Sequence, residues 1–221
     1  MLLAVDTSNE QMGLALLDGA QVIGEYAWRS SQRHTVELAP AVSDLLARCG
    51  LKIEHVTALG VALGPGSFTS LRVGLAFVKG LAMARGIPFI GIPTLDILAH
   101  AQPVSDLPLA VAIQAGRGRF ALGWYQRLGD QWQIQGEARI VSVEALKEEV
   151  KSPSVICGEF TAAERQTILE NENVHLTTPA DSIRRPAVLA QLAWARWQRG
   201  ETDDAASLAP IYLHTAAPIQ S

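Results

Sequence analysis

The sequence contains few of the residues that build disulfide, redox or metal sites. Its 221 residues include only two cysteines, Cys49 and Cys157, and neither lies in a C-x-x-C pair. This excludes a disulfide framework and a cysteine-based zinc or redox motif. The five histidines are scattered, and no two stand at i and i+4 on one helix, the spacing that helical metal sites need. We therefore expect two reduced cysteines in or near the core and no bound metal.

The sequence also lacks long apolar runs, a basic leader and an excess of positive charge. No run reaches the roughly 18 apolar residues that span a bilayer, and polar residues follow the first apolar run too soon for a signal peptide. We expect a cytoplasmic protein without membrane contacts. The 18 Lys and Arg residues against 22 Asp and Glu residues give a net charge of −4. This balance argues against a chain that binds nucleic acid alone by neutralising phosphates.

What is present is a 48% hydrophobic chain whose segments alternate in type. The first half predicts three strands, a helix over 33–48, a strand, a helix over 67–85, a strand and a helix over 94–101. After a Pro-containing link, the second half repeats the order strand, strand, strand, helix, strand, helix, and ends with a helix over 184–199. We expect an α/β protein with mixed sheets and two lobes, 1–102 and 103–221, built from one duplicated unit. The last residues are candidates for packing back on the first lobe.

Two turns carry groups that could hold a nucleotide phosphate. Asp6, Thr7 and Ser8 end the first strand, and a turn containing Gly64, Gly66 and Ser67 starts a helix whose free N–H groups suit anions. Ser67 stands where serine usually caps a helix, and the sequence has no G-x-S-x-G nucleophile motif. The matching turn of the second half, Gln114-Ala115-Gly116-Arg117, has no acid to hold a metal-bound phosphate. We expect no catalytic residue and no ATP hydrolysis by this chain alone.

The helix over 67–85 is apolar on two sides. One stripe is Phe68, Leu71, Leu75, Val78 and Ala82; a second, about 140° away, is Val73, Phe77, Leu81 and Ala84. Arg72 and Lys79 mark one boundary between the stripes, and Gly74 and Gly80 permit close approach of another backbone. One stripe is enough to cover the chain's own sheet, so the second indicates a partner helix or burial between layers of the same fold. The helix over 33–48, with its own stripe, is the natural neighbour.

Several motifs together resemble the bacterial TsaB (YeaZ) family. They are Met1–Ser8, His34-Thr35 with Leu38 and Pro40, Gly64–Thr69 with Arg72 and Gly74, and the late Pro210, Tyr212 and Leu213. The likeness is dense over residues 1–100 and loose in the second half. Two departures stand out: Gln114-Ala115-Gly116-Arg117 replaces a common Asp-Ala-Arg string, and Ser70 replaces a commoner glycine.

The resemblance implies an actin-like ATPase (ASKHA) fold of two ribonuclease-H-like lobes, the second reduced. It implies a non-catalytic scaffold that dimerises with and activates the TsaD transferase, which forms threonylcarbamoyladenosine at position 37 of tRNAs reading ANN codons. A TsaE-like ATPase joins the pair, tRNA is met through the complex, and the chain alone forms a homodimer through the same surface. The resemblance implies no cofactor of its own, with ATP used at the level of the complex.

The resemblance also assigns residues, because in the family the contact is a helical bundle formed by the two helices over 33–48 and 67–85. The predicted partner interface is His34, Leu38, Val42, Leu45, Phe68, Leu71, Arg72, Leu75, Val78, Lys79 and Ala82. The predicted nucleotide-proximal residues are Asp6, Thr7, Ser8, Gly64, Gly66 and Ser67. We expect a charge at Leu75 or Val78 to break the complex without unfolding the monomer. Which apolar stripe faces the partner stays open. The alternatives are a small-substrate ATP-dependent enzyme or peptidase-like hydrolase of the same fold, and a self-associating structural protein.

Overall fold

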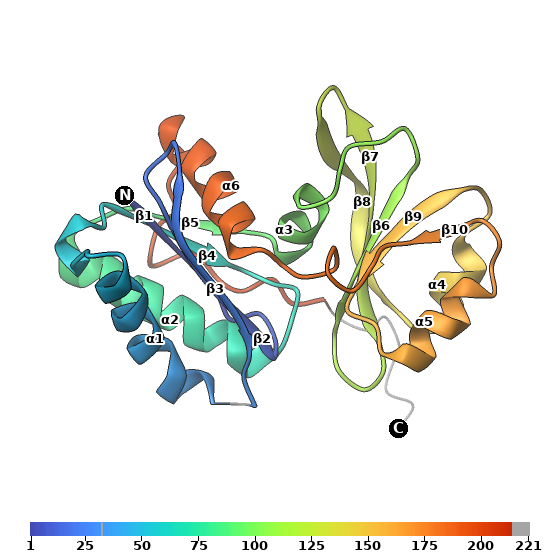
Figure 1. The fold of residues 1–221 in the computed structure, drawn as a ribbon, viewed down its shortest axis with the longest axis horizontal. Helices are drawn as coiled ribbons and strands as arrows, with labels where there is room; N and C mark the ends of the chain where they lie inside the picture. The colour runs from blue at the N-terminus through green and yellow to red at the C-terminus, as the bar shows by residue number, and fades with distance from the viewer. Residues whose placement is uncertain (32, 214–221) are drawn as a thin grey trace. The chain divides into compact units, whose positions relative to one another are not determined.

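The computed structural model describes residues 1–31 and 33–213, and these divide into two compact units (Figure 1). The first unit comprises Met1–Ile97 and Arg184–Ile211, and the second is built on Leu98–Ile183. The predicted boundary at residue 102 is therefore five residues late. The predicted second lobe also includes too much of the sequence, because the segment Arg184–Ile211 belongs to the first unit. Among the described residues, no helix has the length and apolar character needed to cross a membrane.

The first unit is built on a five-stranded sheet of order β3-β2-β1-β4-β5. Its strands are β1 (Leu2–Asp6), β2 (Gln11–Leu17), β3 (Val22–Arg29), β4 (Ala58–Ala62) and β5 (Phe89–Ile92). The first three form an antiparallel meander, and β4 and β5 run parallel to β1. Every residue of the central strands β1 and β4 is buried. Strands buried on both faces require a covering layer on each side of the sheet.

Helices cover both faces of this sheet (Figure 1). On one face lie α1 (His34–Arg48) and α2 (Phe68–Arg85), which contact each other. Their buried stripes share a core with alternate residues of the strands, including Leu3 and Val5. On the other face lies α6 (Pro186–Gln198), whose Leu189 and Ala193 pack with Leu2 and Ala4. The first unit therefore depends on α6, a helix late in the sequence, to bury the second face of its sheet.

The second unit repeats the arrangement of the first. Its sheet has the order β10-β9-β6-β7-β8, the same path as β5-β4-β1-β2-β3. The strands are β6 (Leu109–Gln114), β7 (Phe120–Leu128), β8 (Gln131–Val141), β9 (Ser154–Gly158) and β10 (Val174–Leu176). The helices α4 (Val143–Glu149) and α5 (Ala162–Leu169) take the places of α1 and α2, and α3 (Thr94–His100) and α6 each follow the last strand of a sheet. The shared strand order confirms the predicted duplication.

The start and end of α2 fix its place on the sheet. Ser67 occupies the N-cap position as predicted, but its hydroxyl makes no capping bond to the backbone; it accepts a hydrogen bond from the Ser70 hydroxyl at 3.0 Å. Gly86 ends the helix in the left-handed region at φ 61°, a conformation that glycine adopts readily.

Candidate functional site

The carboxylate of Asp6, at the end of β1, is surrounded by donors from its own chain. Its Oδ1 accepts hydrogen bonds from the backbone N–H and the hydroxyl of Ser8, at 2.8 and 2.6 Å. Its Oδ2 accepts from the Arg184 Nε at 2.8 Å. The fully buried Arg184 also donates to the side chain of Asn9 and the carbonyl of Gln11, at 2.7 and 2.8 Å. The acid that was the best candidate for a metal-bound phosphate is thus held by an internal guanidinium.

The turn between β4 and α2 packs directly on the residues that follow β1. The Ser67 N–H donates to the Ser8 carbonyl at 2.6 Å. The Gly64 N–H donates to the Thr94 hydroxyl at 2.8 Å, and that hydroxyl lies 2.9 Å from the Ser8 hydroxyl. A Cβ at Gly66 would lie 2.2 Å from the Ser8 carbonyl oxygen. Only glycine permits this approach, so the turn is shaped to fit against the end of β1.

A second contact ties α2 to the same place. The Thr7 hydroxyl donates to the Ser70 carbonyl at 2.7 Å. A Cβ at Gly74 would lie 2.2 Å from the Thr7 Oγ1, so Gly74 serves the close approach predicted for it. The structure therefore brings together all six predicted nucleotide-proximal residues. Several of their polar groups, however, already form hydrogen bonds with one another. No group of three or more His, Cys, Asp or Glu side chains is placed to hold a metal within the described part of the chain.

Sequence reasoning missed Arg184, which contributes most to this cluster. The residue lies 178 positions after Asp6, and nothing in its local sequence distinguishes it from the neighbouring Arg185, which is exposed. The available signal was a buried Asp at the end of a central strand, which needs a cation or several donors.

Eight of the eleven predicted interface residues are buried in the first unit, which corrects the prediction that they face a partner. None of them is more than 6% exposed, because the stripes to which they belong cover the chain's own sheet. The expectation that a charge at Leu75 or Val78 would spare the monomer is wrong for the same reason, since these side chains are 6% and 0% exposed. The eight are His34, Leu38, Val42, Leu45, Leu71, Leu75, Val78 and Ala82.

The three remaining predicted interface residues differ from one another. Phe68 is 53% exposed, and the guanidinium of the exposed Arg72 stacks on its ring at 3.7 Å. Lys79 is half-buried, and its ammonium donates to the Leu208 carbonyl at 2.6 Å. Phe68 and Arg72 are therefore presented at the surface, whereas Lys79 holds the returning segment of its own chain.

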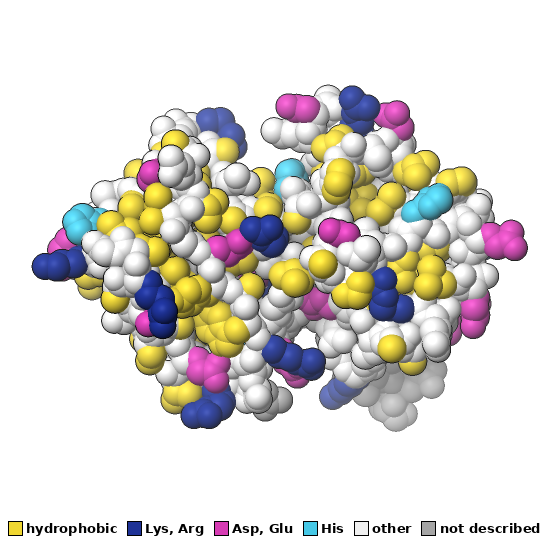
Figure 2. Space-filling view, in the orientation of Figure 1, with side chains coloured by type: hydrophobic (Ala, Val, Ile, Leu, Met, Phe, Trp, Pro, Cys, Tyr) yellow, Lys and Arg dark blue, Asp and Glu magenta, His cyan; other side chains and the backbone are white. Residues whose placement is uncertain are grey.

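The outer face of the α1–α2 pair is formed by different residues. On α2 the exposed positions follow the helical period away from the sheet, and on α1 they include Val36, which is 57% exposed. Met83 is 75% exposed. We call this set the outer face: Val36, Ala39, Pro40, Ser43, Ala47, Phe68, Thr69, Arg72, Ala76, Gly80 and Met83. Figure 2 shows hydrophobic side chains reaching the surface over α1 and α2, among isolated charges.

The second predicted stripe of α2 lies beside the outer face. Val73, Phe77 and Leu81 are half-buried and pack against the core of the first unit, and Ala84 is exposed. This stripe is therefore largely used within the chain. At Gly80, the other glycine predicted to permit close approach, a Cβ would meet nothing within 4 Å, so no backbone among the described residues makes that approach.

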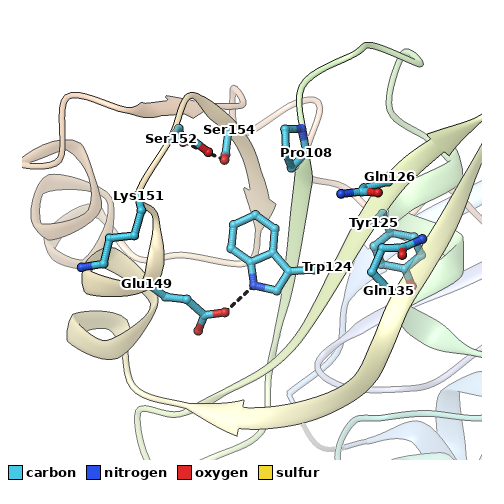
Figure 3. Close-up of a pocket in the computed structure, with 9 residues that line it drawn as sticks. All are labelled: Pro108, Trp124, Tyr125, Gln126, Gln135, Glu149, Lys151, Ser152 and Ser154. Atoms are coloured by element: carbon cyan, nitrogen blue, oxygen red, sulfur yellow. Dashed lines mark hydrogen bonds between the residues drawn. The ribbon is translucent and has the colours of Figure 1, made fainter.

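A separate hollow of about 270 Å³ lies in the second unit, between β7, β8 and the segment after α4. Trp124 stands at its centre, and its indole N–H donates to the Glu149 carboxylate at 2.6 Å (Figure 3). The same carboxylate oxygen accepts from Arg139. Gln126 and Gln135 line the other side. None of the predicted site residues lines this hollow. Its one carboxylate, that of Glu149, already accepts hydrogen bonds from Trp124 and Arg139.

Residues 27–211 match the family model described as TsaD, tRNA N6-adenosine threonylcarbamoyltransferase. The chain is 32% identical over 221 residues to the tRNA threonylcarbamoyladenosine biosynthesis protein TsaB of Bacillus subtilis, covering 97% of this chain and 94% of that protein. It superposes on the solved structure of YeaZ from Pseudomonas aeruginosa with a TM-score of 0.78 at 28% identity, covering 96% and 99% of the two chains.

More distant structures share the fold alone. A ROK hexokinase from Thermus thermophilus superposes with a TM-score of 0.51 at 12% identity, over 90% of this chain and 99% of that one. The duplicated strand order and these neighbours confirm the predicted actin-like ATPase fold. With an extended match to a curated TsaB and a close structural match to YeaZ, the chain belongs to the TsaB (YeaZ) family.

Proposed function

We propose that this chain is a non-catalytic partner subunit in the formation of threonylcarbamoyladenosine at position 37 of tRNAs reading ANN codons. In this proposal it binds and activates a TsaD-type transferase through its outer face. The name of its Bacillus subtilis relative supports the biosynthetic role. The match of residues 27–211 to the transferase family model supports the partner, because two chains of one fold can pair through equivalent helices.

The observation that carries the proposal is Gly80, in the middle of α2. A glycine inside a helix costs about 1 kcal/mol relative to alanine, and no atom of the described residues comes close enough to a Cβ at position 80 to require glycine there. It lies on the outer face between Ala76 and Met83, where small and apolar side chains are exposed. A small residue on an exposed helix face lets a partner helix approach closely. The outer face thus has the composition of a surface that packs against helices of a partner protein.

The absence of catalysis by this chain is supported by the cluster at the end of β1. The Asp6 carboxylate is bonded to Arg184 and Ser8, so binding a metal would require breaking a buried ion pair. ATP use accordingly belongs to the complex, with a TsaE-like ATPase as the third component. In the absence of the transferase, the same outer face pairs two copies of this chain.

The experiment compares two alanines on exposed helical positions of the first unit. Ala76 lies on the outer face of α2 and Ala195 lies on α6, on the opposite side of the sheet. We expect Ala76→Glu to abolish co-elution with the TsaD-type transferase of the same organism in size-exclusion chromatography, and Ala195→Glu to leave it intact. Both variants should keep the unfolding midpoint of the parent chain. Co-elution of Ala76→Glu with the transferase would refute the placement, and ATP turnover by the isolated parent chain would refute the non-catalytic role.

A further inference from the structure

The turn between β6 and β7 has an unusual backbone for its sequence. Within it, the Ala115 N–H donates to the Arg119 carbonyl at 2.8 Å, and the Arg119 N–H donates to the Gly116 carbonyl at 3.2 Å. The φ angles of Gly116, Arg117 and Gly118 are 79°, 55° and 67°. Arg117 and Gly118 are therefore the two central residues of a hairpin turn that requires positive φ at both positions.

Arg117 is poorly suited to this position. It is the one residue other than glycine with positive φ among the described residues. Asparagine, aspartate or glycine would occupy the position with less strain. Packing does not require the two neighbouring glycines, because a Cβ at Gly116 or Gly118 would meet nothing within 4 Å. Gly116, Arg117 and Gly118 are exposed, and no packing contact at the two glycines accounts for an arginine between them.

The side chains of Arg117 and Arg119 make no hydrogen bond or ion pair with any described residue of this chain. Other arginines of the same sheet do: Arg127 pairs with Asp106, and Arg139 with Glu149. The acid close to the turn, Glu159, accepts a hydrogen bond from the Gln114 N–H at 3.4 Å. Within the described part of the chain, two guanidinium groups without an ion pair thus stand two residues apart on this turn, the exposed Arg117 and the half-buried Arg119, in a protein whose net charge is −4.

We propose that this turn binds the phosphate backbone of the tRNA on which the complex acts, so the inference rests on the proposed function. A strained arginine that makes no side-chain hydrogen bond or ion pair with the described residues is accounted for by a contact outside the chain, and guanidinium groups bind phosphate oxygens bidentately. Gly116, Arg117 and Gly118 are all exposed in the described structure. A polyanion such as tRNA can bind to an exposed turn without being enclosed, because its affinity is the sum of many phosphate contacts made with the whole complex. The chain then meets tRNA directly as well as through its partner.

The test measures tRNA affinity of the complex with the TsaD-type transferase, by fluorescence anisotropy at several salt concentrations. Each phosphate contact contributes about 0.9 to the slope of log K against log salt. At 0.15 M salt, Arg117→Asn and Arg119→Gln should therefore each lower affinity about fivefold, and the double variant about 25-fold. The double variant should also reduce the salt slope by about two. Arg199→Gln, which removes a charge from an exposed ion pair on the first unit, should change neither quantity by as much as twofold.

A stability measurement separates binding from misfolding. Asparagine relieves the strain at position 117, so Arg117→Asn should raise the thermal midpoint while it weakens tRNA binding. Unchanged affinity and slope in a double variant that still co-elutes with the transferase would overturn the inference and leave the proposed function standing. Loss of ATP binding by the complex with unchanged tRNA binding would also overturn it, by identifying the turn as a nucleotide site. If the parent chain does not co-elute with the transferase, the proposed function fails, and the inference fails with it.

Discussion

The guanidinium of Arg184 lies 2.8 Å from the carboxylate of Asp6, and this ion pair joins the first strand of the chain to the segment that returns from the second unit. Both side chains are almost completely buried. The pair lies at the end of β1 and joins two segments of the first unit that are far apart in the sequence.

Removal of one member of this pair should be strongly destabilising. Arg184→Met leaves a buried carboxylate without its cation, which typically costs about 3–5 kcal/mol. We expect urea denaturation to show a loss of that size. The double variant Asp6→Asn/Arg184→Met should recover much of it, because an uncharged pair no longer carries the desolvation cost of a lone ion. A loss below about 1 kcal/mol for Arg184→Met would contradict the structural role assigned to the pair.

Two glycines of α2 should respond to alanine in opposite directions. At Gly74 the new methyl group would lie 2.2 Å from the Thr7 Oγ1, so β1 and α2 must separate. Gly74→Ala should therefore lower the free energy of unfolding by about 1–3 kcal/mol, the usual cost of overpacking. At Gly80 the methyl group meets nothing, so Gly80→Ala should raise the free energy of unfolding by about 0.5–1 kcal/mol. Thermal unfolding of both variants measures the difference, and equal shifts would contradict it.

Glu25 should make stability depend on acid pH. Burial raises the pKa of its carboxyl, but the Arg185 hydrogen bond and the Ala187 N–H together outweigh burial and leave this pKa below the ordinary glutamate value. A lowered pKa in the folded state gives stability that is present above the ordinary pKa and is lost as pH falls through the folded-state pKa. Because Ala187 lies in the first turn of α6, Glu25 also satisfies an N–H at the start of that helix.

We therefore expect Glu25→Gln to lower the free energy of unfolding by about 1 kcal/mol at pH 7, a cost comparable to the loss of a helix cap. The difference in free energy of unfolding between this variant and the parent chain should shrink as the pH falls below the ordinary pKa of glutamate. Urea denaturation at pH 7 and at steps down to pH 3 measures this dependence. Glu10→Gln, which disrupts an exposed pair with Arg29, serves as the control and should change stability little at any pH. A constant gap across this pH range would show that Glu25 does not act through its charge.

The two cysteines should react at very different rates in the folded protein. Burial raises the pKa of the Cys157 thiol to about 11, and its side chain is 0% exposed. The thiolate is the reactive form, so Cys157 should resist a thiol reagent at pH 8 until the protein unfolds. Cys49 is half-buried, at the end of α1, and should be modified first. Mass spectrometry of the partly labelled chain identifies the site, and early labelling of Cys157 would show that the second unit opens readily.

The fold was largely predictable because its signals are local. The short apolar run of β2 and the 3.6-residue period in α1 are properties of neighbouring residues, and the duplication follows from the order of elements. The helix over 184–199 was assigned to the second lobe, and its return to the first unit as α6 was not predicted, because the covering of the second face of the sheet is decided by contacts between distant parts of the sequence. The choice between the stripes of α2 was not predictable, since both are apolar. The structure shows that one forms the core and that an intervening row, with Ala76 and Gly80, forms the outer face.

The position of α6 has a consequence for the order in which the chain can fold during synthesis. The first sheet is complete in sequence at Ile92, but the helix that covers its second face ends at Gln198. At about 5–20 residues per second, the ribosome needs roughly 5 to 20 seconds to synthesise the intervening hundred or so residues. During that interval Leu2, Ala4 and their neighbours have no cover from α6, whereas all strands of the second sheet, with α4 and α5, are synthesised before α6 begins at Pro186. The second unit can therefore complete its sheet and these two helices before the first unit can cover the second face of its own sheet.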